Sequence, residues 1–242
     1  MKVRAFGGGS SLGGTFHTMV HMLIAWNVIV FLIQLLAVQF RFVRPSPGTS
    51  LWIPDYLALT QDAIRHGHVW QLFTYMFLHG DFWHIGLNMF MLWMFGTPLE
   101  DLWGSRRFLK YYLITGLGAG VVNALLSPSS AIGASGAIYG LLLAYAMSFP
   151  NRQILLLLFP FPIRAKYLVI IVGAIDLVLM FFHDGIAHLA HLGGLLTGYL
   201  YLKDIPMRWF RGGRHGGGGR GRPRIYDIRN YRDSDDRDSG WK

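Results

Sequence analysis

Residues 111–150 read YYLITGLGAGVVNALLSPSSAIGASGAIYGLLLAYAMSFP, forty residues without a Lys, Arg, Asp or Glu. In a soluble domain about one residue in four is charged, so a gap of this length indicates a hydrocarbon environment. The stretch is also longer than one membrane crossing, which needs about 20 residues. Its middle, SPSS at 127–130, is typical of a turn and is expected to divide the stretch into two helices.

Charge is also missing from residues 19–40, 82–99 and 185–202, and only 14% of the 242 residues are charged while 52% are hydrophobic. Hydropathy, together with these charge-free stretches, predicts six membrane-spanning helices, at about 18–40, 82–99, 110–126, 133–150, 167–183 and 187–203. The apolar run 154–161 is too short to span and is broken by Pro160 and by Pro162 just after it, so it is expected to form an interfacial connection. The predicted fold class is an all-α membrane protein, a six-transmembrane-helix bundle.

The basic residues predict the orientation of this bundle, because cytoplasmic loops carry an excess of Lys and Arg. With the N-terminus inside, the short inside segments hold eight Lys and Arg and the outside loops hold three. We therefore expect an N-in/C-in topology, with 1–17 as a short cytoplasmic N-terminus and 18–203 as the membrane domain.

Residues 204–242 form a tail of different composition. From Lys203 onward the chain has eleven Lys and Arg against six Asp and Glu, with four consecutive glycines at 216–219. Such a segment cannot bury a core, so we expect a disordered, basic, Gly/Arg-rich cytoplasmic tail. Anionic lipid headgroups or RNA could attract it. We favour a solvated tail that fixes the topology, because acidic residues dilute its final stretch, and we expect no nucleic-acid partner.

Polar side chains are costly inside a bilayer and therefore indicate function. His84 and Asn88, four residues apart, share one face of the second predicted span. Ser135 lies in the first turn of the fourth, where backbone N–H groups are unpaired and the helix dipole favours negative charge. His191 lies near the same end of the sixth, and an imidazole can take a serine proton near neutral pH. Ser135 and His191 are thus candidates for a nucleophile and its base.

Small residues four apart allow membrane helices to approach closely. Three predicted spans carry such pairs: Gly136 and Gly140, Gly194 and Gly198, and Gly116 and Gly120. If the first two pairs face each other, Ser135 and His191 become neighbours and Tyr139 lies under the imidazole. Each feature taken singly is more often a matter of packing, and only their convergence at one end of the bundle favours a catalytic site.

These residues resemble the rhomboid family of intramembrane serine proteases over about 60–203. WQLFTYMFLHGDFWHIGLN at 70–88 carries the family's His-x4-His-x3-Asn signature at His79, His84 and Asn88. EDLWGSRRF at 100–108 is similar to the second connecting loop, GASGAIYG at 133–140 to the nucleophile helix, and AHLGGLLTG at 190–198 to the base helix. One departure is Gln71, where the family often has Arg.

The resemblance implies a serine endopeptidase with a Ser135–His191 dyad, in which His84, Asn88 and the Ser135 N–H stabilise the oxyanion. Supporting roles fall to Tyr139, Gly133, Gly136, His79 and Gly194, and His79, His84 and His188 are expected to line a path for water. Substrates would be transmembrane helices of other membrane proteins, within the lipid bilayer. No cofactor or metal is expected. The chain would be an integral multi-pass protein of the bacterial inner (plasma) membrane.

Asp176 is the one acid inside a predicted span. We expect it near the bilayer centre, below the dyad, as a neutral or hydrogen-bonded group. A role as a third catalytic residue is the less favoured interpretation, and no aspartate is expected to orient His191.

Three other classes of protein fit the sequence less well. A haem or metal protein could use His79, His84, His188 and His191, but it lacks a His-Glu-x-x-His motif and leaves Ser135 without a role. An inactive relative that only binds membrane proteins would not need Ser135 and His191 intact. A small-solute transporter predicts polar groups at mid-span, whereas those here gather near one face.

Overall fold

The computed structural model describes residues 19–40, 56–156, 159–182 and 186–204. The elements in chain order are α1 (Met19–Gln39), α2 (Gln61–Arg65), α3 (Gln71–Thr74), the 3-10 helix η1 (Tyr75–Phe77), α4 (Phe82–Trp103), α5 (Ser105–Leu126), α6 (Ser135–Ser148), β1 (Gln153–Leu156), β2 (Phe159–Arg164), α7 (Ala165–Leu179) and α8 (His188–Asp204). Each of the six predicted spans corresponds to one long helix. The predicted N-terminal segment 1–17 and the tail, apart from Asp204, lie outside the described residues.

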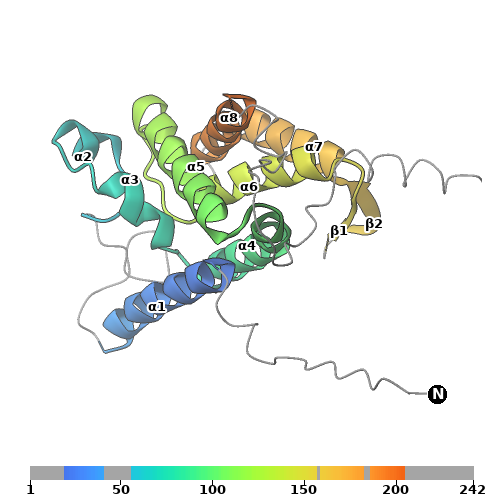
Figure 1. Ribbon diagram of the computed structural model, residues 1–242. Coiled ribbons are helices and arrows are strands. Elements are labelled where there is room, and N and C mark those ends of the chain that lie inside the picture. The colour runs from blue at the N-terminus through green and yellow to red at the C-terminus, as the bar shows by residue number, and fades with distance from the viewer. Residues whose placement is uncertain (1–18, 41–55, 157–158, 183–185, 205–242) are drawn as a thin grey trace, which may run out of the picture.

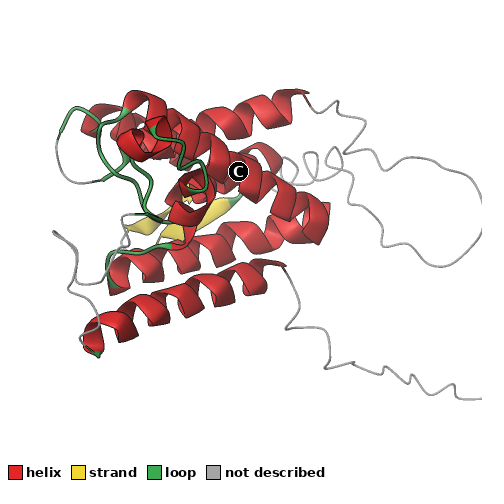
Figure 2. Ribbon diagram, turned by 90° about the vertical axis from the view of Figure 1, so that its left-hand side faces the viewer, coloured by secondary structure: helices red, strands yellow, loops and turns green. Residues whose placement is uncertain are grey.

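The long helices form one bundle in which α6 is central (Figure 1). It packs against α4, α5, α7 and α8, while α1 lies along α4 on one side of the bundle. Figure 2 shows most of the long helices lying alongside one another, with the described loops gathered towards one end. Fully buried Leu92, Phe95 and Leu99 of α4 and Leu141 of α6 belong to a single apolar core.

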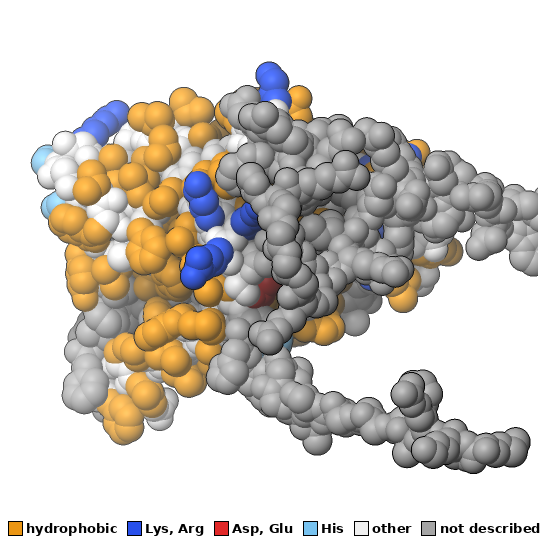
Figure 3. Space-filling view, in the orientation of Figure 1, with side chains coloured by type: hydrophobic (Ala, Val, Ile, Leu, Met, Phe, Trp, Pro, Cys, Tyr) orange, Lys and Arg blue, Asp and Glu red, His pale blue; other side chains and the backbone are white. Residues whose placement is uncertain are grey.

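The outer surface of this bundle is also apolar. Large hydrophobic side chains on several helices are exposed, among them Trp26, Ile33, Leu125 and Phe181, and Figure 3 shows such side chains covering much of one face. Water disfavours so much exposed apolar area on a monomer. Two helices, α1 and α5, are both long enough and apolar enough to cross a bilayer.

The segment before α6 enters the interior of the bundle instead of running over its surface. Ala131, Gly133 and Ala134 are buried, and Leu59 and Ala131 exchange two backbone hydrogen bonds of 3.1 and 2.9 Å. Helix α6 begins only at Ser135 and has 14 residues, about 21 Å at ~1.5 Å per residue. Its N-terminus therefore lies below the end of the bundle.

Glu100, in the sequence that resembles the second connecting loop, ties three elements together. Its carboxylate accepts hydrogen bonds from the backbone N–H groups of Met19 (2.7 Å) and Val20 (2.9 Å), the first two residues of α1. It also accepts one from the Ser105 hydroxyl at the start of α5 (2.5 Å). A carboxylate at a helix N-terminus satisfies unpaired donors and complements the helix dipole.

The connection between α6 and α7 differs from the prediction. Strands β1 and β2 pair antiparallel with Gln153 opposite Arg164, so the fold is mostly helical but not strictly all-α. Pro160 and Pro162 both lie in β2. Prolines are tolerated there because the strand has a free edge.

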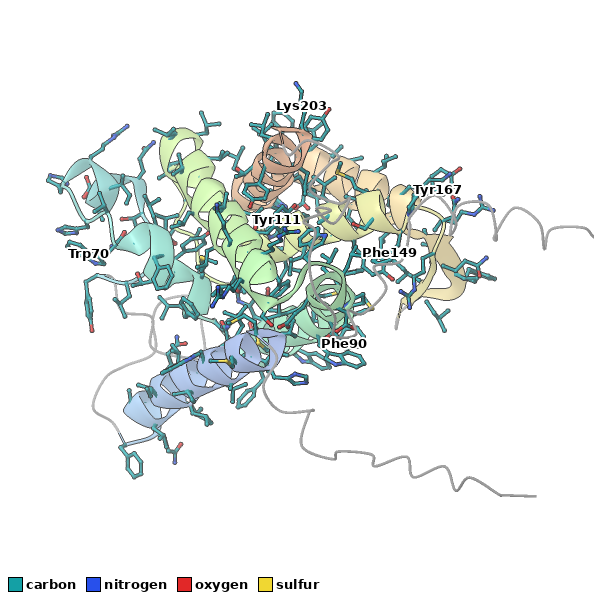
Figure 4. All side chains as sticks on the ribbon, viewed as in Figure 1. Trp70, Phe90, Tyr111, Phe149, Tyr167 and Lys203 are labelled. Carbon is teal, nitrogen blue, oxygen red and sulfur yellow. The ribbon has the colours of Figure 1, made fainter. Side chains whose placement is uncertain are left out.

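The glycine pairs meet as predicted. An added Cβ on Gly194 of α8 would lie 1.9 Å from the carbonyl oxygen of Gly136 on α6, and one on Gly198 would lie 3.4 Å from the Gly140 Cα. Tyr111 points from α5 into the interior (Figure 4) and donates a hydrogen bond to the Gly140 carbonyl over 2.8 Å. Helices α5, α6 and α8 are thus held at backbone contact.

Gly194→Ala is therefore expected to destabilise the protein by about 1–3 kcal/mol, because the methyl group forces α6 and α8 apart. Thermal unfolding in detergent micelles measures this. Gly86→Ala on α4 is the matched control, since nothing lies within 4 Å of its added Cβ. Equal stability of the two variants would contradict the close packing of α6 and α8.

Candidate active site

Ser135 and His191 are direct neighbours. Ser135 Oγ lies 2.8 Å from His191 Nε2, across 56 residues of sequence. Ser135 is the first residue of α6 and is partly exposed, while His191, in the first turn of α8, is 9% exposed. A serine and an imidazole at hydrogen-bond distance can act as a nucleophile and its general base.

Tyr139 holds the plane of the imidazole. Its ring stacks on His191 with centroids 4.2 Å apart and planes inclined by 10°, as the sequence predicts. Tyr139 lies one turn after Ser135 on α6, so the helix that carries the candidate nucleophile also supports the candidate base.

His84 faces Gly133, two residues before Ser135. The backbone N–H of Gly80 donates to His84 Nδ1 over 3.3 Å, which places the ring proton on Nε2. An added Cβ on Gly133 would lie 2.6 Å from that Nε2, so only glycine fits here. Gly133 also has φ +107°, a conformation that favours glycine, and its N–H donates to the Tyr75 carbonyl over 2.8 Å. The Nε2–H donor of His84 is thus directed at the segment that precedes Ser135.

Asn88 lies one turn after His84 on α4 and is 7% exposed. One N–H of its amide donates to the His84 carbonyl over 2.8 Å. The amide nitrogen carries two hydrogens, so a second donor remains for another group. Because α4 packs against α6, the predicted pair of donors lies on the helix that faces the start of α6.

His79 is not at the surface. Its side chain is 0% exposed, neither ring nitrogen has a hydrogen-bond partner among the described residues, and its ring meets that of His84 edge-on at 5.0 Å. The predicted water-lining role is therefore wrong for His79, which packs behind His84. Burial, and then the proximity of His84, lowers the pKa of His79 from 6.5 to about 3. Gln34 of α1 fixes this loop through its side chain, which donates to the His79 carbonyl over 3.2 Å.

The low pKa of His79 predicts a pH-dependent stability. Between about pH 6.5 and 3, His79 binds a proton in the unfolded chain but stays neutral in the folded protein. The free energy of unfolding is therefore largest above pH 6.5 and falls as the pH decreases. For one proton, this dependence of the free energy of unfolding on pH approaches about 1.4 kcal/mol per pH unit. Unfolding in detergent from pH 7.5 to 5 should show a shallower slope for His79→Leu than for the wild type. The exposed His66→Leu should keep the wild-type slope, and a His79→Leu slope equal to it would contradict this account.

Asp176 does not lie where the sequence analysis placed it. Its Oδ1 is 3.0 Å from His191 Nδ1 and also pairs closely with His188 Nδ1. The reason is that α7 ends at Leu179 and not near 183, so Asp176 is one turn from the end of its helix. The expectation that Asp176 lies below the dyad without contact to His191 is therefore wrong. His188 is 4% exposed and pairs with Asp176, so the water-lining role predicted for it is also wrong.

Asp176 lies in the last turn of α7 and His188 is the first residue of α8, so the two residues border the same connection. The donor atoms of Asp176, His188 and His191 all lie within 4.8 Å of one another, which is also a spacing that could hold a metal ion.

Comparisons with known proteins agree with this geometry. Residues 66–204 match the model of the rhomboid domain. Rhomboid protein 1, mitochondrial, of Saccharomyces cerevisiae is 30% identical over 76% of this chain and 52% of its own length. Rhomboid protease GluP of Bacillus subtilis is 36% identical over 75% of this chain and 34% of its own length. RHOMBOID-like protein 6, mitochondrial, of Arabidopsis thaliana is 35% identical over 65% of this chain and 50% of its own length.

The chain thus spans about half, or less, of the length of these three relatives. They include mitochondrial proteins of yeast and a plant, so they do not support the expectation of a bacterial inner membrane. The family is membrane-embedded, and GluP is named as a protease. Because the match to the rhomboid domain covers more than half of this chain, the chain belongs to the rhomboid family.

Proposed function

We propose that this protein is an intramembrane serine endopeptidase that cleaves transmembrane segments of other membrane proteins. The observation that carries the proposal is the 2.8 Å contact between Ser135 Oγ and His191 Nε2 at the N-terminus of a helix that begins inside the bundle. An inactive family member has no need of a serine and an imidazole in register at that position.

In the proposed reaction, His191 takes the proton of the Ser135 hydroxyl at Nε2 as the serine oxygen attacks the carbonyl carbon of the scissile peptide. The tetrahedral intermediate collapses when the same proton passes from His191 to the leaving amine. Water then attacks the acyl-serine as His191 takes one of its protons. The bond between the acyl carbon and Ser135 Oγ breaks, His191 returns the proton to that oxygen, and the new carboxylic acid is released and ionises.

The negative charge of the intermediate would be held by donors that are already in place. His84 Nε2–H, the second amide N–H of Asn88 and the first-turn N–H groups of α6 are the candidates. His84 is held by Gly80, and Asn88 by the His84 carbonyl, so neither has to reorganise during the reaction. Preorganised donors in a water-poor site stabilise developing charge most effectively.

The membrane arrangement is part of the proposal. All six long helices would span the bilayer, with residues 1–17 and 204–242 on the cytoplasmic side and the site near the opposite face. At the site α4, α6 and α8 begin, and α7 ends, which is the alternation that consecutive spans require. A substrate helix must unwind locally before its carbonyls can reach Ser135, because helical carbonyls are hydrogen-bonded within the segment.

Reconstitution into liposomes tests the proposal. A single-span protein present in the same bilayer should be cut within or beside its apolar segment, and EDTA should have no effect on the rate. A single-span protein whose segment is a polyleucine helix, which resists unwinding, should be cut far more slowly. Absence of cleavage for a panel of single-span proteins with helix-breaking residues would contradict the assignment.

A further inference from the structure

Asp176 stands between two imidazoles in the part of the chain that the structure describes. Its Oδ1 accepts hydrogen bonds from His191 Nδ1 (3.0 Å) and from His188 Nδ1, while the side chain is about 5% exposed. The mechanism proposed above uses Ser135 and His191 and leaves this carboxylate without a role. Burying a carboxylate costs free energy unless the group is paired. The two N–H donors on one oxygen of Asp176 supply that pairing and so indicate a specific role for the carboxylate.

We propose that Asp176 is a positioning residue for His191, and that His188 in turn holds Asp176, so that the site is a Ser135–His191–Asp176 triad with a second histidine behind it. This inference rests on the proposed function. It assigns Asp176 no contact with the substrate, because the carboxylate acts only through the imidazole that lies between it and Ser135.

The direction of the hydrogen bonds explains how Asp176 acts. An ionised carboxylate only accepts, so His191 must carry a proton on Nδ1. Its Nε2 then has a free lone pair, and the Ser135 hydroxyl donates to it over 2.8 Å. This is the tautomer that a general base needs, and the carboxylate selects it before the substrate arrives.

Asp176 also stabilises the charge that forms during the reaction. When His191 takes the serine proton it becomes an imidazolium, and the carboxylate 3.0 Å away is its counter-charge. Asp176 keeps its own charge throughout, since the proton on Nε2 passes onward to the leaving amine. Tyr139 stacks on the ring of His191 and fixes its plane. Asp176 and Tyr139 together therefore leave the imidazole little freedom to rotate.

His188 has a distinct task. It is the first residue of α8, one turn before His191, and it donates to the same Oδ1 that His191 uses. It thereby links the end of α7 to the start of α8 and keeps the carboxylate aimed at His191. The other oxygen, Oδ2, is buried without a hydrogen-bond partner among the described residues, so the pairing through Oδ1 carries the placement of the group.

The test compares Asp176→Asn with Asp62→Asn, an exposed acid in the first turn of α2. In liposomes Asp176→Asn should lower kcat by roughly 10–10²-fold with KM within about twofold, whereas Asp62→Asn should match the wild type. Nitrogen-15 NMR of histidine-labelled protein should show His191 protonated on Nδ1 in the wild type. In Asp176→Asn the amide can donate to Nδ1, so the population should move towards Nε2–H. A merely structural role would leave that tautomer unchanged.

Two further arms make the outcomes separable. His188→Gln should retain the Nδ1–H tautomer but lower kcat less than Asp176→Asn does, and it covers the case in which Asp176→Asn fails to fold. Wild-type kcat and an unchanged His191 tautomer in both variants, with Ser135 still essential, would overturn this inference alone. Loss of wild-type activity in EDTA with recovery in Zn2+ would also overturn it, by making the three donors a metal site. Cleavage that persists without Ser135 would instead overturn the proposed function.

Discussion

Ser135→Ala and His191→Ala are each expected to abolish cleavage of a single-span substrate in liposomes, with a loss on the order of 10⁴–10⁶-fold in kcat/KM. Without Ser135 Oγ no acyl intermediate can form. Without His191 the hydroxyl keeps its proton, and the leaving amine has no acid at the 2.8 Å contact seen here. The two losses should not add in the double variant, because both residues act in one step.

Two control variants remove the same kinds of side chain at positions away from the contact between Ser135 and His191. Ser148→Ala removes a hydroxyl from the far end of α6, and His66→Ala removes an exposed imidazole from the end of α2. Both should retain wild-type activity, and all four single variants should unfold at similar temperatures in detergent. Substantial cleavage by either Ser135→Ala or His191→Ala would end the assignment of nucleophile and base.

Asn88→Ala is expected to lower kcat by about 10²–10³-fold while KM stays nearly constant, and His84→Ala should behave alike. A donor aimed at the oxyanion strengthens its hydrogen bond only as negative charge develops, so its loss raises the barrier without weakening substrate binding. For His84 the prepared donor is the Nε2–H beside Gly133, held by the Gly80 N–H at Nδ1.

Steady-state kinetics in liposomes, with substrate expressed as a mole fraction of lipid, separate kcat from KM. Leu87→Ala, which removes an exposed side chain from the same helix, is the control and should change neither constant by more than about twofold. If Asn88→Ala and His84→Ala raised KM and left kcat intact, these residues would be contacts for the bound substrate and not oxyanion donors.

The positions of the long helices and the central pair of residues could be predicted from the sequence. Charge-free stretches locate α1, α4, α5, α6 and α8, and hydropathy locates α7 although it carries Asp176. The glycine pairs on α6 and α8 predict a contact at backbone distance, and the structure has it between Gly136 and Gly194. Once those faces meet, helix geometry alone brings Tyr139 under His191.

The environment of Asp176 could not be predicted, because hydropathy locates a helix without locating its ends. Shifting the end of α7 from about 183 to Leu179 moves Asp176 from mid-span to the last turn, beside His188 and His191. The hairpin of β1 and β2 is not predictable from the sequence for a related reason. Short apolar runs with prolines indicate a break in the helices but not what replaces it.

The most direct test of the central claim is covalent labelling with a fluorophosphonate, which reacts with an activated serine and with no ordinary hydroxyl. The 242-residue chain in detergent should gain one adduct, and peptide mass spectrometry should place it on Ser135 among the serines of the chain. Labelling should disappear in Ser135→Ala and fall to background in His191→Ala. An adduct on another residue, or labelling that survives in Ser135→Ala, would contradict the account.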